Sequence, residues 1–236
     1  MTHKRTLLTV GAHPDDIEIG MGGTVALHSK KDNVYMLSLT EGDLSSNGTV
    51  ETRQQEAERA AEILGAGRLQ LTWRDRMLTA VSQEEYTQLV QLIRRIQPDV
   101  IFAPYYLDRH PDHGDAGNIV KRAVFDAGVK LYPGVDENAH KVPDMYYYMI
   151  NGYHRPAFYV DITQAAGDKE AALRAYKSQF NPGEDAVSTP LTDGYLETIQ
   201  ARDRLFGKET GVTYAEGFIA ETPMLFQQVP GRQGSD

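Results

Sequence analysis

The sequence contains no cysteine among its 236 residues, which excludes disulfide bonds and thiolate metal ligands. Any metal ion must therefore be held by histidine, aspartate or glutamate side chains. The sequence also lacks an apolar run approaching the roughly 20 residues that a membrane-spanning helix needs. Its opening stretch, MTHKRTLLTV, carries only a short apolar patch without a small-residue cleavage site. We therefore expect a cytoplasmic protein that does not associate with membranes.

Positive charge is scarce as well. The 24 lysines and arginines are outnumbered by 33 aspartates and glutamates, which gives a formal net charge of -9, and they do not cluster along the chain. Proteins that bind nucleic acids or anionic membranes need a basic surface, so we expect a small-molecule substrate instead. The length supports one substantial hydrophobic core and no repeat or linker divides it, so we expect residues 1–236 to form a single domain.

Short apolar runs alternate with longer helical patterns through the first two thirds of the chain. This alternation is typical of a parallel sheet with right-handed crossovers. The predicted fold class is α/β, with a Rossmann-like, mostly parallel sheet flanked by helices and a C-terminal part that covers the active-site rim. We predict strands at 6–10, 34–39, 69–73, 100–103, 145–150 and 157–162, and helices at 21–31, 52–64, 82–97, 115–127, 163–179 and 195–206.

Two acidic loops follow the first and the fourth predicted strands. The first loop reads GAHPDDIEIG and the second reads PYYLDRHPDHGDAG. Ligands of an open parallel sheet bind beyond the carboxyl ends of its strands, so both loops are expected at that rim. The side chains that would converge there are His13, Asp15, Asp16, Asp108, His110, Asp112, His113 and Asp115.

A catalytic zinc site uses three protein ligands and keeps a position for water. His13 and Asp16 from the first loop and His113 from the second would supply such a set, which suits activation of water by a divalent ion. Asp15, beside a ligand, is then a candidate for the general base. Taken alone, however, Asp15 and Asp16 also fit a role as caps or favourable charges at a helix N-terminus.

His110 is a candidate for stabilising an oxyanion and protonating a leaving nitrogen, with Asp112 as the carboxylate that orients it. The alternative for His110 and His113 is that both are solvated surface histidines. What favours a metal site is that each of the two loops carries a histidine before Pro-Asp and that both loops are predicted at one rim.

Three glycines, Gly20, Gly22 and Gly23, raise a second hypothesis, a pyrophosphate-binding turn of a nucleotide-binding module. They begin too late after the strand and do not have the G-x-G-x-x-G spacing. The carboxylates of Asp15 and Asp16 would also repel a phosphate there. We therefore expect these glycines to allow close packing of the helix against the sheet.

The pair of motifs AHPDD, followed by EIG, and RHPDH resembles the PIG-L/LmbE family of zinc-dependent N-deacetylases, which act on N-acetylglucosaminyl compounds. Further segments look like the bacillithiol-biosynthesis deacetylases of the first subtype, so that the likeness covers nearly the whole chain. These segments are EGDLSSNGT with the following Arg53, FAPYYLDRHPDH, YMINGYH, TPLTDGYLET and YAEGF.

The resemblance implies hydrolysis of the acetamide of N-acetylglucosaminyl-malate to acetate and glucosaminyl-malate. It implies one divalent ion per chain, zinc or in the cell iron, and a homo-oligomer such as a hexamer. Carried over by position, the family's metal ligands fall on His13, Asp16 and His113, its base falls on Asp15, and its second catalytic histidine with a partnering aspartate falls on His110 and Asp112.

Two further residues are candidates for binding the substrate. A guanidinium matches a carboxylate in two-point contact, so Arg53 could hold the malate carboxylates, although it could also be an exposed helix arginine. Tyr195 could contact the substrate or the oxyanion, or it could simply be a packed or surface tyrosine.

Three alternatives stay open from the sequence. The same chemistry could act on another N-acetylglucosaminide, such as diacetylchitobiose or an inositol glycoside. A nucleotide-binding module and a metal-binding protein without turnover are the more distant alternatives.

Overall fold

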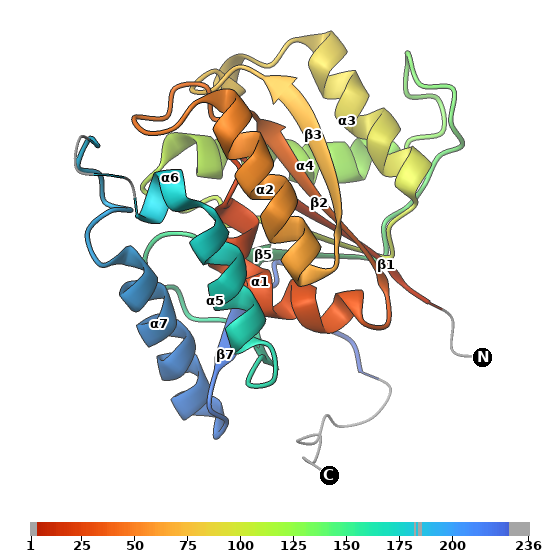
Figure 1. Cartoon of the computed structure of the whole chain (residues 1–236). Coiled ribbons are helices and arrows are strands. Elements are labelled where there is room, and N and C mark those ends of the chain that lie inside the picture. The colour runs from red at the N-terminus through yellow and green to blue at the C-terminus, as the bar shows by residue number, and fades with distance from the viewer. Residues whose placement is uncertain (1–3, 182, 184–185, 227–236) are drawn as a thin grey trace.

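The computed structural model describes residues 4–181, 183 and 186–226. A seven-stranded sheet runs in the order β3-β2-β1-β4-β5-β7-β6 (Figure 1). Strands β1 to β5 are parallel to one another, whereas β7 pairs antiparallel with both β5 and β6. The prediction of an α/β fold with a mostly parallel sheet is confirmed. The strands are β1 (Thr6–Gly11), β2 (Asn33–Thr40), β3 (Gly67–Trp73), β4 (Val100–Pro104), β5 (Asp144–Tyr148), β6 (Phe158–Asp161) and β7 (Ala215–Ile219).

Helices cover both faces of the sheet. Helices α1, α2 and α5 pack together on one face, and α3 and α4 pack together on the other (Figure 1). Each layer has its own hydrophobic core against the sheet. No helix in the described part of the chain is long and apolar enough to cross a membrane. The helices are α1 (Asp16–Ser29), α2 (Val50–Leu64), α3 (Gln83–Ile96), α4 (Pro111–Ala127), α5 (Ala166–Ala175), α6 (Lys177–Phe180) and α7 (Tyr195–Thr210), with one 3-10 turn at Leu78–Ala80.

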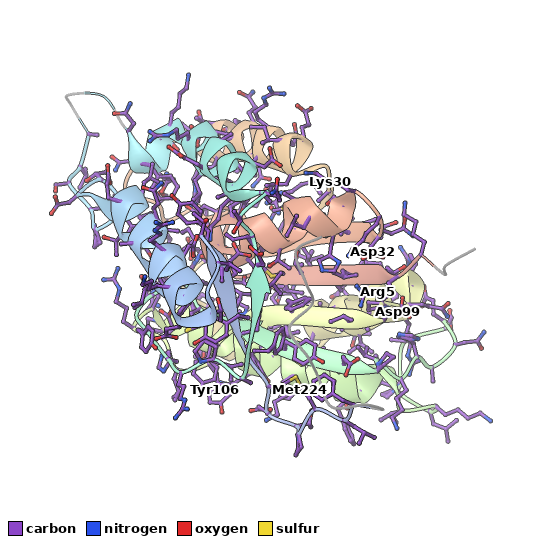
Figure 2. All side chains as sticks on the ribbon, turned by 90° about the horizontal axis from the view of Figure 1, so that it is seen from below. Arg5, Lys30, Asp32, Asp99, Tyr106 and Met224 are labelled. Carbon is purple, nitrogen blue, oxygen red and sulfur yellow. The ribbon has the colours of Figure 1, made fainter. Side chains whose placement is uncertain are left out.

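Two carboxylates accept backbone hydrogen bonds at the amino end of β1. Asp99 accepts a hydrogen bond from the backbone N–H of Thr6 at 2.7 Å, and Asp32 accepts one from that of Arg5 at 3.3 Å. Figure 2 shows Arg5, Asp32 and Asp99 together at this end of the sheet. These side chains satisfy backbone donors at the start of β1, and the two acidic segments lie at the opposite rim.

Two helices begin earlier than the sequence predicts. Helix α4 starts at Pro111, because proline is favoured in a first helical turn, where its missing N–H costs no hydrogen bond. Asp112 and His113 therefore lie in the first turn of a helix and not in a loop. Helix α1 starts at Asp16 directly after Asp15, whose φ of 95° ends the preceding loop in a left-handed conformation.

The C-terminal third covers one end of the sheet, as predicted, but with different elements. The single helix predicted at 163–179 is broken at Tyr176 into α5 and α6. Strand β7 was not predicted, since it carries a glycine and the buried Glu216 in place of an alternating pattern.

Buried charges are stable only when paired, and Lys169 of α5 lies 2.7 Å from Asp203 of α7 and 2.8 Å from Glu216. This ion cluster joins α5, α7 and β7.

The glycines of α1 allow close packing and not phosphate binding, as their spacing indicates. A Cβ at Gly20 would overlap the ring of Tyr148 on β5, and one at Gly23 would lie 2.8 Å from the side chain of Ile162. The close approach brings the start of α1 onto the sheet, directly behind the loop that contains His13.

Replacing Gly20 by alanine should therefore destabilise the protein. Forcing a methyl group into a packed core costs about 1–3 kcal/mol, so Gly20→Ala should lower the free energy of unfolding in urea by that order. Gly167→Ala is the matched control, because nothing lies within 4 Å of the corresponding Cβ on α5. Equal stability of the two variants would refute the packing role of Gly20.

Candidate metal centre and active site

The predicted site residues gather at the carboxyl ends of β1 and β4, around a cavity of about 550 Å³. The cavity lies between the two acidic segments on one side and the C-terminal part of the chain on the other. Asp108, Asp112 and Asp115, which the sequence also predicts at this rim, do not line it. The predicted residues that do line it are His13, Asp15, Asp16, Arg53, His110, His113 and Tyr195.

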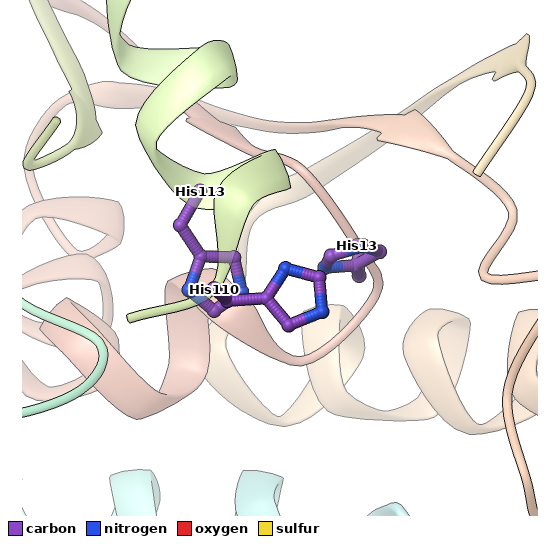
Figure 3. A group of neighbouring side chains, drawn as sticks. All are labelled: His13, His110 and His113. Carbon is purple, nitrogen blue, oxygen red and sulfur yellow. The ribbon is translucent and has the colours of Figure 1, made fainter. Parts of the chain in front are cut away.

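Three histidines meet at the floor of this cavity (Figure 3). The rings of His110 and His113 are stacked with centroids 4.6 Å apart, and the ring of His13 lies edge-on to both, at 4.9 Å and 5.4 Å. Ligand atoms of the three rings lie within 4.8 Å of one another. Stretches of the chain about 100 residues apart thus form one cluster of nitrogen donors, which a metal ion could use.

The carboxylate of Asp16 lies between two of these rings. Its Oδ1 is 3.1 Å from Nε2 of His113, and its Oδ2 is 3.5 Å from Nδ1 of His13. Two donor atoms of a tetrahedral zinc ion with bonds near 2.1 Å are about 3.4 Å apart, so these spacings fit a shared ion. All three side chains are buried. His13 and His113 belong to a group of donors within 4.8 Å of one another, whereas Asp16 does not, so the ligand set of His13, Asp16 and His113 stays a prediction that these two distances allow.

Carboxylates also hold the outer nitrogens of the two histidines. Nδ1 of His113 lies 3.0 Å from Asp108, and Nε2 of His13 lies 3.0 Å from Asp75 and 3.3 Å from Asp112. When the outer nitrogen donates its proton to a carboxylate, the inner nitrogen keeps its lone pair for a metal ion. Both rings are thereby oriented toward Asp16.

The pKa values of Asp16 and His113 are shifted because the two groups form an ion pair. Burial alone would raise the pKa of Asp16, but the facing His113 and His13 lower it well below its usual value. Burial alone would lower the pKa of His113, but Asp16 and Asp108 raise it to about 9. Protons are therefore held between these groups, and a divalent ion competes for the same place because its ligands must be deprotonated.

A second group of donors shares His13. Atoms of His13, Asp75 and Asp112 also lie within 4.8 Å of one another. Asp112, however, already accepts hydrogen bonds from the backbone N–H of Arg76 at 2.9 Å and from its guanidinium at 3.3 Å. A cation beside that guanidinium would be repelled. This contact argues against a cation between Asp75 and Asp112.

Asp15 has a different environment from its neighbour. Its φ of 95° is a strained value for a residue other than glycine, and the carboxylate is buried. Burial raises the pKa of Asp15 to about 7, against the opposing effect of Arg53, whose Nη2 lies 3.3 Å away. A carboxyl group with a pKa in this range is suited to accepting a proton at neutral pH.

Arg53 is not an exposed helix arginine. It is buried, and its guanidinium donates to the carbonyl oxygen of Pro14 at 2.7 Å, to Asp15 at 3.3 Å and to the carbonyl oxygen of Gly42 at 3.3 Å. The positive φ of Gly42 and its lack of a Cβ make room for this contact. Arg53 lines the cavity, yet most of its hydrogen-bonding capacity is used within the chain.

The remaining candidates are placed as follows. His110 caps α4 and is half-buried, and burial and the neighbouring His113 and His13 lower its pKa. Asp112 contacts His13 and Arg76, so the hydrogen bond to His110 that the sequence suggests is not among the contacts described, and the orienting role of Asp112 stays a prediction. Tyr195 lies in the cavity wall, where its hydroxyl donates to Asn151 at 3.0 Å.

Asp75 was missed by the sequence analysis. Its Oδ2 also accepts from the backbone N–H of Leu44 at 3.3 Å, which joins the loop after β2 to His13. The sequence feature that could have identified Asp75 is its position two residues after β3, at the rim where the other acidic loops were expected. Asp108 was placed at the rim without a role, and the structure shows that it orients His113.

Removing a metal ligand should differ from removing an orienting carboxylate. Asp16→Asn should abolish stoichiometric zinc binding, whereas Asp75→Asn should retain it with an affinity about 10–100-fold lower. Metal content after dialysis and chelator competition measure the two effects. The reverse pattern, with zinc lost from Asp75→Asn and kept by Asp16→Asn, would place the ion on the other side of His13.

Comparison with known proteins identifies the family of the chain. The PIG-L family model, described as GlcNAc-PI de-N-acetylase, matches residues 8–124. Diacetylchitobiose deacetylase of Thermococcus kodakarensis is 32% identical over 95% of this chain and 86% of that protein. The crystal structure of a conserved protein from Thermus thermophilus superposes with a TM-score of 0.86 at 36% identity, covering 96% of this chain and 99% of the other.

The likeness to bacillithiol-biosynthesis enzymes is more distant. A probable N-acetyl-alpha-D-glucosaminyl L-malate deacetylase 2 of Bacillus subtilis is 28% identical over 75% of this chain and 84% of that protein. The family predicted from the sequence is thus confirmed, whereas specificity for the malate compound is not. The chain belongs to the PIG-L family of deacetylases, metal-dependent hydrolases that act on amide bonds.

Proposed function

We propose that this protein removes the acetyl group from an N-acetylglucosaminide, with one zinc ion held by His13, Asp16 and His113. The observation that carries the proposal is the pair of oriented imidazoles that face one buried carboxylate at the floor of an open cavity. A family that contains acetylated-sugar deacetylases supports the substrate class.

When bound, the ion supplies Lewis acidity, which lowers the pKa of water and polarises a carbonyl group. Asp15 takes a proton from the water whose oxygen attacks the acetamide carbon. His110, which also lines the cavity, donates a hydrogen bond to the oxyanion that develops. The carbon–nitrogen bond then breaks as the proton taken up by Asp15 is returned to the sugar nitrogen, which releases acetate and a free amine and restores the carboxylate of Asp15. Tyr195 in the cavity wall contacts the sugar.

The next question is which group is attached to the N-acetylglucosamine of the substrate. The likeness to a diacetylchitobiose deacetylase at 32% identity supports a second amino sugar as this group. Arg53 was our candidate for holding malate, but its guanidinium is engaged by Asp15, Pro14 and Gly42, which weakens that candidate. We therefore place an N-acetylated disaccharide first. Assembly as a homo-oligomer, with a hexamer as the form expected from the family, stays a prediction.

A specific observation keeps the malate compound as the second candidate. The cavity is also lined by Arg76 and Arg109, and both of these side chains reach solvent. Guanidinium groups at the entrance would attract a substrate that carries carboxylates.

Asp15→Asn should separate catalysis from metal binding. The amide keeps the shape of the carboxylate but cannot accept the proton, so turnover should fall about 10²–10⁴-fold. Zinc content should stay at the wild-type level, because Asp15 is not a proposed ligand. A deacetylation rate near that of wild type would show that another group is the base.

A substrate panel tests the proposed function. Diacetylchitobiose, N-acetylglucosaminyl-malate and an N-acetylglucosaminyl inositol should be compared by detecting the amine released. We expect release from at least one, abolished by a chelator and restored by zinc, with diacetylchitobiose giving the highest kcat/KM. A preference for the malate compound that disappears in Arg109→Gln would instead support the second candidate. No release from any of the three by zinc-loaded protein would contradict the proposed function.

A further inference from the structure

Helix α1 is interrupted directly behind the metal centre. Met21 has a φ of -152°, which no α-helix accommodates, and it divides α1 into two segments. In a continuous helix, the N–H of Gly23 would donate to the carbonyl oxygen of Ile19. The N–H of Gly23 donates to the carboxylate of Glu216 instead, at 3.0 Å. The carbonyl oxygen of Ile19 accepts from Nη2 of Arg202 at 2.9 Å. Side chains from the C-terminal part thus complete the interrupted helix.

The same guanidinium holds a second segment. Nη1 of Arg202 donates to the carbonyl oxygen of Ile150 at 2.8 Å. The next residue, Asn151, donates from its backbone and its side chain to Asp108, both at 2.9 Å. Asp108 in turn holds Nδ1 of His113 at 3.0 Å. A short line of hydrogen bonds therefore runs from Arg202 to a metal-ligand candidate.

The two segments that Arg202 joins carry two different ligand candidates. Ile19 lies three residues after Asp16, in the first turn of α1, and Ile150 begins the line to His113. We propose that Arg202 is a positioning residue, which fixes the separation of Asp16 and His113 by bridging the segments that carry them. It acts without touching the substrate or the ion.

The chemistry of arginine suits this bridge. A planar guanidinium presents several N–H groups in a rigid fork, so that two carbonyl oxygens in different segments can be held at a fixed spacing. The carbonyl group of Ile19 needs a donor because it lies at the end of a helical segment, and that of Ile150, just beyond the end of β5, also accepts a longer hydrogen bond from the hydroxyl of Tyr195 at 3.3 Å. A lysine has a single ammonium group on a flexible stem, and it would hold the two carbonyls less rigidly.

The spacing matters because a metal site tolerates little displacement. Ligand distances vary by only about 0.2 Å around their preferred values. If α1 moved away from the end of β5, the gap of 3.1 Å between Asp16 and His113 would change. The inference rests on the metal centre of the proposed function but not on the identity of the substrate.

Arg202→Met and Arg202→Lys test the proposal in the full chain. The zinc dissociation constant is measured by competition with a chelator, and the visible absorption of the cobalt-loaded protein reports the coordination geometry. We expect Arg202→Met to weaken zinc binding about 10–100-fold, the range for residues that support metal ligands, and to change the cobalt spectrum. Arg202→Lys should fold and show a smaller change in the same direction.

Two variants of the same helix serve as controls. Arg204→Met removes an exposed arginine that donates to the carbonyl oxygen of Thr213, away from the site. Phe206→Leu loosens a separate small core, in which Phe206 packs on Tyr153 and Tyr159, and so lowers Tm without affecting the bridge. Both should bind zinc within about twofold of wild type, because distant sites act independently.

Two results would overturn the proposal. One is wild-type zinc affinity with an unchanged cobalt spectrum in Arg202→Met. The other is a loss of affinity in Phe206→Leu as large as in Arg202→Met, which would show that general loosening is the cause. If no acetylated sugar is a substrate but Arg202→Met alone still loses zinc affinity, the positioning role stands and the proposed function fails.

Discussion

The buried carboxylate of Asp16, set between the inner nitrogens of His13 and His113, is the constraint on which the rest of this structure depends. Ion pairs with the two imidazoles lower the pKa of Asp16 and raise that of His113, and a divalent ion would compete with protons for this place. The surrounding architecture keeps these side chains there. The glycines of α1 bring that helix onto the sheet, and Asp75, Asp108 and Asp112 fix the outer nitrogens of the rings.

The two neighbouring aspartates illustrate how position sets chemistry. Asp16 faces two imidazoles, which lower its pKa, whereas Asp15 is turned by a left-handed backbone toward a single buried guanidinium, and burial raises its pKa to about 7. One carboxylate is thereby suited to hold a cation and the other to move a proton. Adjacent residues of the same type can therefore perform separate tasks in one cavity.

Much of the fold and the proposed ligand set could be predicted from local patterns. Buried strands and amphipathic helices have clear periods, and the rule that parallel strands end at one rim brings the two His-Pro-Asp loops together. The rest depends on contacts between distant residues, for which a single sequence gives no local signal. Asp75 meets His13 across 62 positions, and Arg202 meets Ile19 across 183. The break at Met21 is equally invisible, because side chains far along the chain stabilise it.

The central claim is the position of the ion, and anomalous diffraction from zinc-soaked crystals tests it most directly. We predict one peak about 2.0–2.2 Å from Nδ1 of His13, Nε2 of His113 and a carboxylate oxygen of Asp16. A peak on the other side of His13, between Asp75 and Asp112, or no peak within reach of Asp16, would contradict the account.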